Sequence, residues 1–387
     1  MKFKRVFLIV LDSLGVGAAE DANKFNDEGT NTFKHILENN KNVYPNLEKM
    51  GLLNIVNNTN NETDSYFCKA KPKANGKDTL TGHLELMGIR TLVPFKTFTD
   101  SGFPKELIDE LEKKSGRKVI GNISASGTEI IENLGKEHME TGSIIVYTSA
   151  DSVLQIAAHE EIVHLDELYK ICEIARELTL KDEWKVGRII ARPFVGKPGS
   201  FVRTSNRHDY ALNPVSDTVL DKLKQSNYDV ISIGKISDIF NGCGITKSVK
   251  TKDNFDGIMK ILNTTSLDFN GLCFANLNDF DSKYGHRRDI DGYANAIKEF
   301  DLFLPKIKEY LLDDDLLIIT ADHGNDPSYK GTDHTRENIP VLVYSKKFNE
   351  TGKIEDLDCF SDIGETILDI FDIDLLNVGK SFLEKLK

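Results

Sequence analysis

The chain has 387 residues, of which 61 are acidic and 49 are basic, and its formal net charge at pH 7 is −12. This acidic balance argues against a nucleic-acid-binding protein that works through a broad basic face. The length exceeds that of one ordinary compact core and predicts two domains or a large core with an insertion. No apolar run approaches the length of a membrane-spanning helix, so we expect no membrane partner.

The N-terminal sequence and the spacing of the cysteines indicate the cellular compartment of the protein. The apolar run 6–11 follows a short basic stretch, but it is shorter than the apolar region of a signal peptide and Asp12 ends it. The five cysteines are scattered singly and include no CxxC pair, which favours neither a disulfide framework nor a zinc ribbon. We therefore expect a cytoplasmic protein.

Short apolar runs bounded by Asp, Asn or Gly predict buried strands at 6–11, 229–234, 272–277, 316–320 and 341–344. Helix-like segments such as 291–303 lie between these runs. Strands that alternate with helices predict an α/β fold, in which helices cover both faces of a mainly parallel sheet.

The middle of the chain differs from the two ends in its sequence pattern. From about Pro94 to Pro214, a helix-like segment at 104–114 and an amphipathic segment at 165–180 are joined by connections rich in Gly and Pro. Because the predicted strands come from both sides of this region, we interpret it as an inserted domain. We expect a core domain of residues 1–94 and 216–387 and an inserted cap domain of residues 95–215.

Acidic side chains follow three of the predicted strands. Asp12 follows the run 6–11, Asp279 and Asp281 follow 272–277, and Asp322 follows 316–320. Because parallel strands end at the same edge of a sheet, we expect these carboxylates to meet there. An Asp after a strand is also a common helix N-cap, so each of them has a purely structural alternative.

Histidines accompany these acids. His286 lies five residues after Asp281, His323 follows Asp322, and His334 comes eleven residues after His323. Carboxylate oxygens mixed with imidazole nitrogens suit Mn²⁺, Zn²⁺ or Fe²⁺, and the absence of thiolates argues against a structural zinc site. The sequence therefore predicts a two-metal site. We expect Asp279 and Asp333 in turn or supporting positions, because Asp281 has the better spacing to His286.

The segment 76–83 contains a candidate nucleophile. Thr79 follows a glycine and precedes the helix-like segment 84–87, so backbone N–H groups at a helix N-terminus could face a phosphate. Coordination to a metal would lower the pKa of its hydroxyl. Thr79 could instead be a plain N-cap, and Thr81 or Ser13 could replace it as the nucleophile.

Two glycine motifs resemble nucleotide-binding signatures without matching them. The segment Gly15-Val16-Gly17 is followed by Glu20, where a dinucleotide fingerprint needs Gly or Ala. Gly76-Lys77 lacks the Ser or Thr that follows Lys in a P-loop. We expect neither function.

In this order the motifs resemble the alkaline phosphatase superfamily, and within it the bacterial phosphopentomutase family. The resemblance covers almost the whole chain and is carried by the segments Val10 to Gly15, Gly76 to His83, Tyr147 to Gln155, Gly234 to Asp238, Asp281 to Arg288 and Ala321 to Arg336. It implies an alkaline-phosphatase-like core with a mainly parallel sheet between helices, together with an inserted α+β cap.

The resemblance also implies a set of site residues. Two Mn²⁺ ions are expected, and Thr79 is expected to carry a phosphoryl group. Asp281, His286 and His334 would form one metal site, whereas the other would contain Asp12, Asp322, His323 and the Thr79 oxygen.

Sugar-phosphate contacts are expected from Ser149, Asp151, Arg188, Arg203 and Lys235. Arg can bind phosphate through two donors, and Asp can orient ribose hydroxyls. Arg207 could replace Arg203 in this role, and Arg192, next to Pro193, is expected to be structural.

The implied activity is the interconversion of ribose 1-phosphate and ribose 5-phosphate, and of the 2-deoxyribose phosphates, in nucleoside salvage. A sugar bisphosphate such as glucose 1,6-bisphosphate would prime Thr79, and the partners would be small sugar phosphates. The alternatives are a phosphoglycerate mutase, whose family carries serine as the nucleophile, a hydrolytic phosphatase, and a metal-holding sensor of sugar phosphates.

Overall fold

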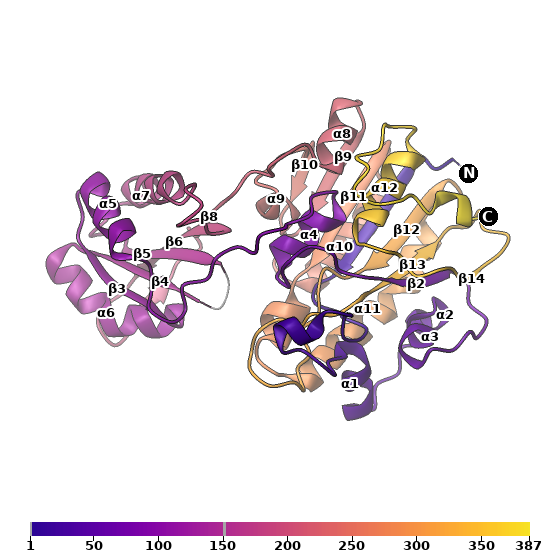
Figure 1. The fold of residues 1–387 in the computed structure, drawn as a ribbon, viewed down its shortest axis with the longest axis horizontal. Helices are drawn as coiled ribbons and strands as arrows, with labels where there is room; N and C mark the ends of the chain where they lie inside the picture. The colour runs from indigo at the N-terminus through magenta and orange to yellow at the C-terminus, as the bar shows by residue number, and fades with distance from the viewer. Residues whose placement is uncertain (1, 150–151) are drawn as a thin grey trace. The chain divides into compact units, whose positions relative to one another are not determined.

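A computed structural model describes residues 2–149 and 152–387. The chain divides into two compact units: Met1–Val93 with Asn213–Lys387, called the core unit here, and Pro94–Leu212, called the inserted unit (Figure 1). No helix among the described residues is long and apolar enough to cross a membrane. All five cysteines are free thiols.

The described part of the core unit contains an eight-stranded sheet in the order β10-β9-β11-β1-β12-β13-β2-β14. The strands are β1 (Arg5–Leu11), β2 (Tyr66–Ala70), β9 (Asp229–Ile233), β10 (Lys247–Val249), β11 (Gly271–Leu277), β12 (Asp315–Thr320), β13 (Ile339–Tyr344) and β14 (Gly352–Lys353). The central strands β1, β11 and β12 are buried at every position, as expected for strands covered on both faces.

The five predicted strands are confirmed as β1, β9, β11, β12 and β13, and the pairs among β10, β9, β11, β1 and β12 are parallel. β13 differs, because it runs antiparallel to both β12 and β2. The connection from β12 to β13 contains no crossover helix, so the chain turns back along the sheet. That connection carries His323 and His334.

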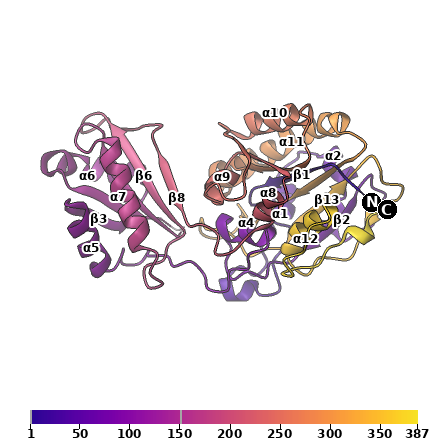
Figure 2. The same ribbon diagram turned by 90° about the horizontal axis from the view of Figure 1, so that it is seen from above.

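Helices cover both faces of this sheet. α10 packs against α11 and β11, whereas α12 packs against α4 and α8. Figure 2 shows α10 and α11 on one side of the sheet and α4 and α12 on the other. The α-helices are α1 (Thr32–Asn39), α2 (Pro45–Lys49), α3 (Leu52–Asn57), α4 (Thr79–Leu86), α8 (Val219–Gln225), α9 (Ile236–Ile239), α10 (Asn254–Thr265), α11 (Ile290–Tyr310) and α12 (Ser361–Ile370). Shorter turns are η1 (Ala22–Phe25), the π-helical η2 (Phe280–Gly285) and η3 (Leu383–Lys385).

The inserted unit has its own sheet, in the order β3-β4-β5-β6-β7 with β8 paired to β6. Its strands are β3 (Val119–Ser124), β4 (Ile144–Thr148), β5 (Val153–His159), β6 (Arg188–Val195), β7 (Val202–Arg203) and β8 (His208–Ala211), and its helices are α5 (Lys105–Ser115), α6 (Gly127–Thr141) and α7 (Leu165–Leu178). α5 and α7 cover one face and share a large apolar core with it. α6 covers only part of the other face, through a smaller cluster around Ile145 and Phe194.

Candidate active site

Three neighbouring parallel strands deliver the predicted carboxylates to one edge of the core sheet. β1 lies between β11 and β12, and the three strands are in register along their whole length. Asp12 directly follows β1, Asp322 follows β12 after one residue, and Asp281 follows β11 by four residues. The topology therefore brings together side chains that are about 310 positions apart.

Asp12, Asp322 and His323 form the first cluster, and one ligand atom of each lies within 4.8 Å of the others. His323 Nε2 is 3.4 Å from Asp12 Oδ1 and 3.3 Å from Asp322 Oδ2. The opposite ring nitrogen, Nδ1, is 2.9 Å from the carbonyl of Gly324 and donates to it. In the neutral ring, Nε2 therefore presents a lone pair to the two carboxylates.

This cluster fits a cation. Asp12 Oδ1 and Asp322 Oδ2 are buried and accept no hydrogen bond from the described residues. His83 Nδ1 lies 3.1 Å from Asp322 Oδ2, but it is aligned with the Thr79 carbonyl at 2.9 Å instead. Burying carboxylate oxygens without partners is costly, and a divalent ion would satisfy both of them.

The remaining oxygens of the two carboxylates are held by the protein. Asp322 Oδ1 accepts the backbone N–H of Ser13 at 3.0 Å, and Asp12 Oδ2 accepts Asn276 Nδ2 at 2.9 Å. Burial and the neighbouring charge of Asp322 raise the pKa of Asp12. Burial opposes the charged form of Asp322 too, but His323, His83 and the N–H of Ser13 together lower the pKa of Asp322.

Asp281, His286 and His334 form the second cluster, again with one ligand atom of each within 4.8 Å of the others. Asp281 Oδ2 is 3.2 Å from His286 Nε2, and Asp281 Oδ1 is 3.4 Å from His334 Nε2. The two imidazole Nε2 atoms are 3.0 Å apart. Burial would raise the pKa of Asp281, but the charge of His334 and the hydrogen bonds of both imidazoles lower it well below the usual range.

A π-helical turn, η2, places Asp281 and His286 on the same side of the chain. The N–H of His286 donates to the carbonyl of Asp281 at 3.0 Å, which is an i to i+5 bond. In an α-helix, residues five apart point in different directions, because each residue turns by about 100°. The wider π turn therefore makes a five-residue spacing suitable for two ligands of one ion.

Neighbouring groups orient the second cluster. His286 Nδ1 donates to the carbonyl of Thr332 at 2.7 Å, and Asn325 Nδ2 donates to Asp281 Oδ1 at 2.8 Å. Such bonds fix the direction of metal-binding side chains. The rings of His334 and His323 have centroids 4.2 Å apart, so the two clusters are adjacent.

Thr79 is the first residue of α4, and its Oγ1 lies 3.1 Å from His323 Nε2. The preceding residue, Asp78, is the N-cap and accepts from the backbone N–H of Thr81 at 3.0 Å. The hydroxyl of Thr81 donates to the same carboxylate at 2.6 Å, and the buried hydroxyl of Ser13 is 2.9 Å from Tyr293 Oη. Of the three candidate hydroxyls, only that of Thr79 reaches the first cluster within hydrogen-bond distance.

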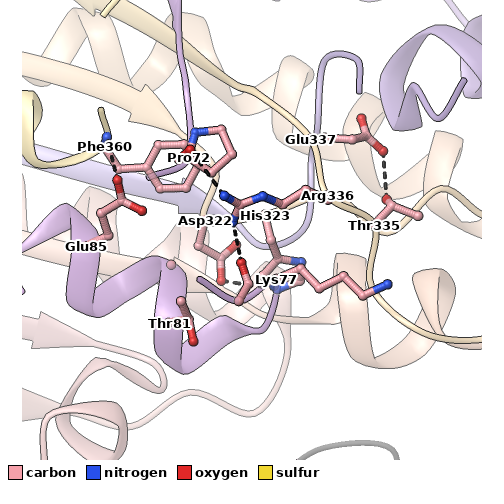
Figure 3. Close-up of a pocket in the computed structure, with 12 residues that line it drawn as sticks. Pro72, Lys77, Thr81, Glu85, Asp322, His323, Thr335, Arg336, Glu337 and Phe360 are labelled. Atoms are coloured by element: carbon pink, nitrogen blue, oxygen red, sulfur yellow. Dashed lines mark hydrogen bonds and ion pairs between the residues drawn. The ribbon is translucent and has the colours of Figure 1, made fainter. Parts of the chain in front are cut away.

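Arg336 and Glu85 hold the loop that leads into α4 (Figure 3). The guanidinium of Arg336 donates to the carbonyls of Ala74 and Gly76 at 2.7 and 2.6 Å. The carboxylate of Glu85 accepts the backbone N–H groups of Lys73 at 2.9 Å and Ala74 at 2.7 Å. Two buried charges thus fix the backbone immediately before Thr79.

Glu337 links three neighbouring segments of the core. Its carboxylate accepts the N–H and the hydroxyl of Thr32 at 3.0 and 2.8 Å, the hydroxyl of Thr335 at 2.7 Å and the N–H of Gly17 at 3.1 Å. A cavity of ≈ 10 Å³ between Arg336 and α4 has room for about one water molecule.

The predicted sugar-phosphate contacts belong to both units. Ser149, Arg188 and Arg203 lie in the inserted unit, where Ser149 follows β4, Arg188 begins β6 and Arg203 ends β7. Lys235 lies in the core unit as the N-cap residue of α9. Asp151 falls outside the described residues.

Several supporting residues were missed by the sequence analysis. His83 and Asn276 contact the first cluster, Asn325 contacts the second, and Arg336 and Glu337 hold the surrounding loops. Asn276 carried one usable signal, because an amide inside the apolar run 272–277 needs a hydrogen-bond partner.

The chain is similar to a family of known proteins and to several solved structures. Residues 4–375 match the model of the metalloenzyme superfamily. A phosphoglycerate mutase of Leishmania mexicana has 11% identity and a TM-score of 0.52, and the match covers 98% of this chain and 97% of that one. The PH0037 protein of Pyrococcus horikoshii has 15% identity and a TM-score of 0.48, with 99% of each chain covered. A protein of the alkaline phosphatase superfamily from Vibrio parahaemolyticus has 13% identity and a TM-score of 0.45, with 99% of this chain and 70% of that one covered.

Three observations support the same assignment: the fold, the two clusters of metal-ligand side chains, and the family match along nearly the whole sequence. The ligand clusters and the family together indicate a metal-binding enzyme. The chain belongs to the metalloenzyme superfamily.

Proposed function

We propose that this enzyme is a phosphopentomutase that interconverts ribose 1-phosphate and ribose 5-phosphate, and the 2-deoxyribose phosphates, in nucleoside salvage. The observation that carries the proposal is the Thr79 hydroxyl at the start of α4, 3.1 Å from His323 Nε2 in a buried ligand cluster. The motif segments around this hydroxyl resemble those of phosphopentomutases, whereas the phosphoglycerate mutase family carries serine at this position.

In this proposal the two units have separate tasks. The core, residues 1–94 and 216–387, would transfer the phosphoryl group, and the inserted cap, residues 95–215, would bind the sugar phosphate. Ser149, Asp151, Arg188 and Arg203 of the cap, with Lys235 of the core, are the proposed substrate contacts.

Two Mn²⁺ ions would be held by the two clusters, one by Asp281, His286 and His334 and the other by Asp12, Asp322, His323 and the Thr79 oxygen. When bound, such ions supply positive charge that stabilises the transferring phosphoryl group and favours ionisation of the Thr79 hydroxyl.

Thr79 would carry the phosphoryl group, placed on Oγ1 by a sugar bisphosphate such as glucose 1,6-bisphosphate. The bond from Oγ1 to phosphorus breaks as the free hydroxyl of the pentose monophosphate bonds to phosphorus and loses its proton. The product is the 1,5-bisphosphate. Its other phosphoryl group then returns to Thr79, and the sugar oxygen left behind takes up a proton, so phosphothreonine is regenerated.

The N-terminus of α4 suits this role. The first N–H groups of a helix have no partner within the helix and carry part of the positive end of its dipole. They can therefore donate to a phosphoryl group on Thr79, while Asp78 caps the third residue of the helix. Arg336 and Glu85 keep the preceding backbone in place.

A direct assay tests the proposal. The purified enzyme, primed with glucose 1,6-bisphosphate and supplied with Mn²⁺, should convert ribose 1-phosphate to ribose 5-phosphate. Interconversion of 2- and 3-phosphoglycerate, or release of phosphate with no isomerisation, would refute a pentose mutase. Binding of sugar phosphates with no turnover at all would favour a sensor instead.

A further inference from the structure

One face of the inserted sheet carries more positive than negative charge, in a chain with a net charge of −12. Arg188 and Arg192 of β6 are four residues apart and so share a face. The strand register adds Arg203 of β7 and Asp209 of β8 to it. This is the face that α6 covers only in part.

The single carboxylate among these residues, that of Asp209, already has a partner. Asp209 accepts Nε and Nη2 of Arg207, both at 2.6 Å, and lies 3.8 Å from Nη1 of Arg188. The side chain of Arg203 has no hydrogen bond or ion pair with the described residues, and the side chain of Arg192 donates to them only through Nε, to Gln155 Oε1 at 3.0 Å. Burial lowers the pKa of Arg192 to about 10, which reflects the cost of holding this cation half-buried without an anion.

Tyr147 of β4 adds an unsatisfied hydroxyl to the same face. It pairs with Gln155 across the sheet, its side chain is fully buried, and its Oη has no hydrogen-bond partner among the described residues. A buried donor without an acceptor destabilises the fold, and an acceptor supplied by a ligand would remove that cost. Burial raises the pKa of Tyr147, so the phenol stays protonated and can donate.

The hydroxyl of Tyr147 faces the N-terminus of α6. A Cβ atom on Gly127, the first residue of this helix, would lie 2.6 Å from Tyr147 Oη and 3.4 Å from Arg203 Nη1. α6 is 15 residues long, and the side chain of its N-cap residue, Ser126, makes no capping hydrogen bond. The first N–H groups of α6, the phenol and the guanidinium therefore lie around one small region that lacks an acceptor.

We propose that Arg192, Arg203, Tyr147 and the first turn of α6 form a binding site for the phosphate group of a sugar phosphate. This inference rests on the proposed function and extends it, because the site would hold the phosphate that is not being transferred. The sequence predicts substrate contact for Arg203 and a structural role for Arg192. The half-buried position of Arg192 with only one of its donor groups used assigns it a role in binding.

Calorimetry with the full-length Thr79→Ala protein tests the site without turnover. Arg192→Gln should weaken binding of ribose 5-phosphate about 10- to 100-fold, because a charge-assisted phosphate contact is lost. Tyr147→Phe, which keeps the ring and its packing, should weaken it about 3- to 10-fold. The matched control is Lys136→Gln, which removes the same charge from an exposed position of α6 and should leave binding unchanged.

The outcomes separate this site from the proposed reaction. Equal affinities of Arg192→Gln, Tyr147→Phe and Lys136→Gln for ribose 5-phosphate, with unchanged unfolding midpoints, would overturn the phosphate site. If the wild-type enzyme neither isomerises nor binds pentose phosphates, but inorganic phosphate binds in a way that depends on Arg192, the pentose reaction fails and the site stands. Binding of free ribose should not depend on Arg192 at all.

Discussion

Replacing Arg336 with methionine removes the guanidinium that ties the loop before α4 to the rest of the core. Nη1 donates to the carbonyls of Ala74 and Gly76 at 2.7 and 2.6 Å, and Nε lies 2.9 Å from Asp21. Methionine keeps most of the apolar length of the side chain. The change therefore deletes mainly hydrogen bonds.

The expected loss of stability follows from these contacts. Each carbonyl left without its donor costs about 1–3 kcal/mol, and the carbonyl of Ala74 is buried whereas that of Gly76 is part-buried. The ion pair with Asp21 adds little, because the Asp21 side chain is 34% exposed. We expect a destabilisation of about 3–5 kcal/mol and, at roughly 2–4 °C per kcal/mol, a fall in the unfolding midpoint of roughly 6–20 °C.

Activity should fall as well, because the loop leads directly into Thr79 at the start of α4. A displacement of about 1 Å at a reacting group can cost about 100-fold in rate, so we expect kcat to drop by about that factor. Arg336→Lys retains one donor group, so its kcat and its unfolding midpoint should lie between those of the wild type and those of Arg336→Met. The control is Arg90→Met, since the exposed Arg90 makes a single bond at 3.2 Å to the carbonyl of Val378. If Arg336→Met and Arg90→Met have the same unfolding midpoint and the same kcat, the loop is held by other contacts and the reasoning is wrong.

Three further changes test other parts of the structure. Thr79→Ala should abolish phosphate incorporation from a sugar bisphosphate while the fold persists, as measured by mass spectrometry of the intact protein; a stable phosphate on any other residue would contradict its assignment as carrier. Asp281→Asn should lose about one metal ion per chain and keep the other, because the two clusters share no ligand; equal loss of both ions would show that they are coupled. His138 is buried and its Nε2 accepts the N–H of His159 at 2.8 Å, so burial lowers its folded-state pKa below 6.5. As the pH falls, this histidine takes up a proton in the unfolded chain before it does so in the folded chain. The free energy of unfolding should therefore fall as the pH drops below about 6.5, by at most ~1.4 kcal/mol per pH unit. Urea unfolding at several pH values measures this dependence, which His138→Phe should remove.

The core strands could be predicted because parallel strands buried on both faces appear as continuous apolar runs. β11 illustrates this, since every residue of Gly271–Leu277 is buried. The strands of the inserted unit could not be recognised in the same way. β5 and β6 carry Gln155, Arg188 and Arg192 on a face that lacks a complete helical cover, so polar residues interrupt their apolar runs.

The six side chains predicted as metal ligands are brought into two clusters, because the ends of parallel strands coincide and each of the three acids lies within four residues of the end of its strand. Residue spacing does not show which neutral group supports which ligand. Asn276 reaches Asp12 on the neighbouring strand, and Asn325 reaches Asp281 from a loop 44 positions away. These contacts depend on sheet order and loop path, which pairwise spacing in the sequence does not contain.

Because of the π turn between Asp281 and His286, the site depends on the number of residues between these two side chains. Such turns are uncommon because their hydrogen-bond geometry is less favourable than that of an α-helix. One ion bound to both side chains would clamp the five-residue spacing. In an ordinary α-helix the same five-residue spacing would point His286 away from Asp281. Removing a single residue between them would therefore disable the site while every ligand remained in the chain, so the length of this segment matters as much as its composition.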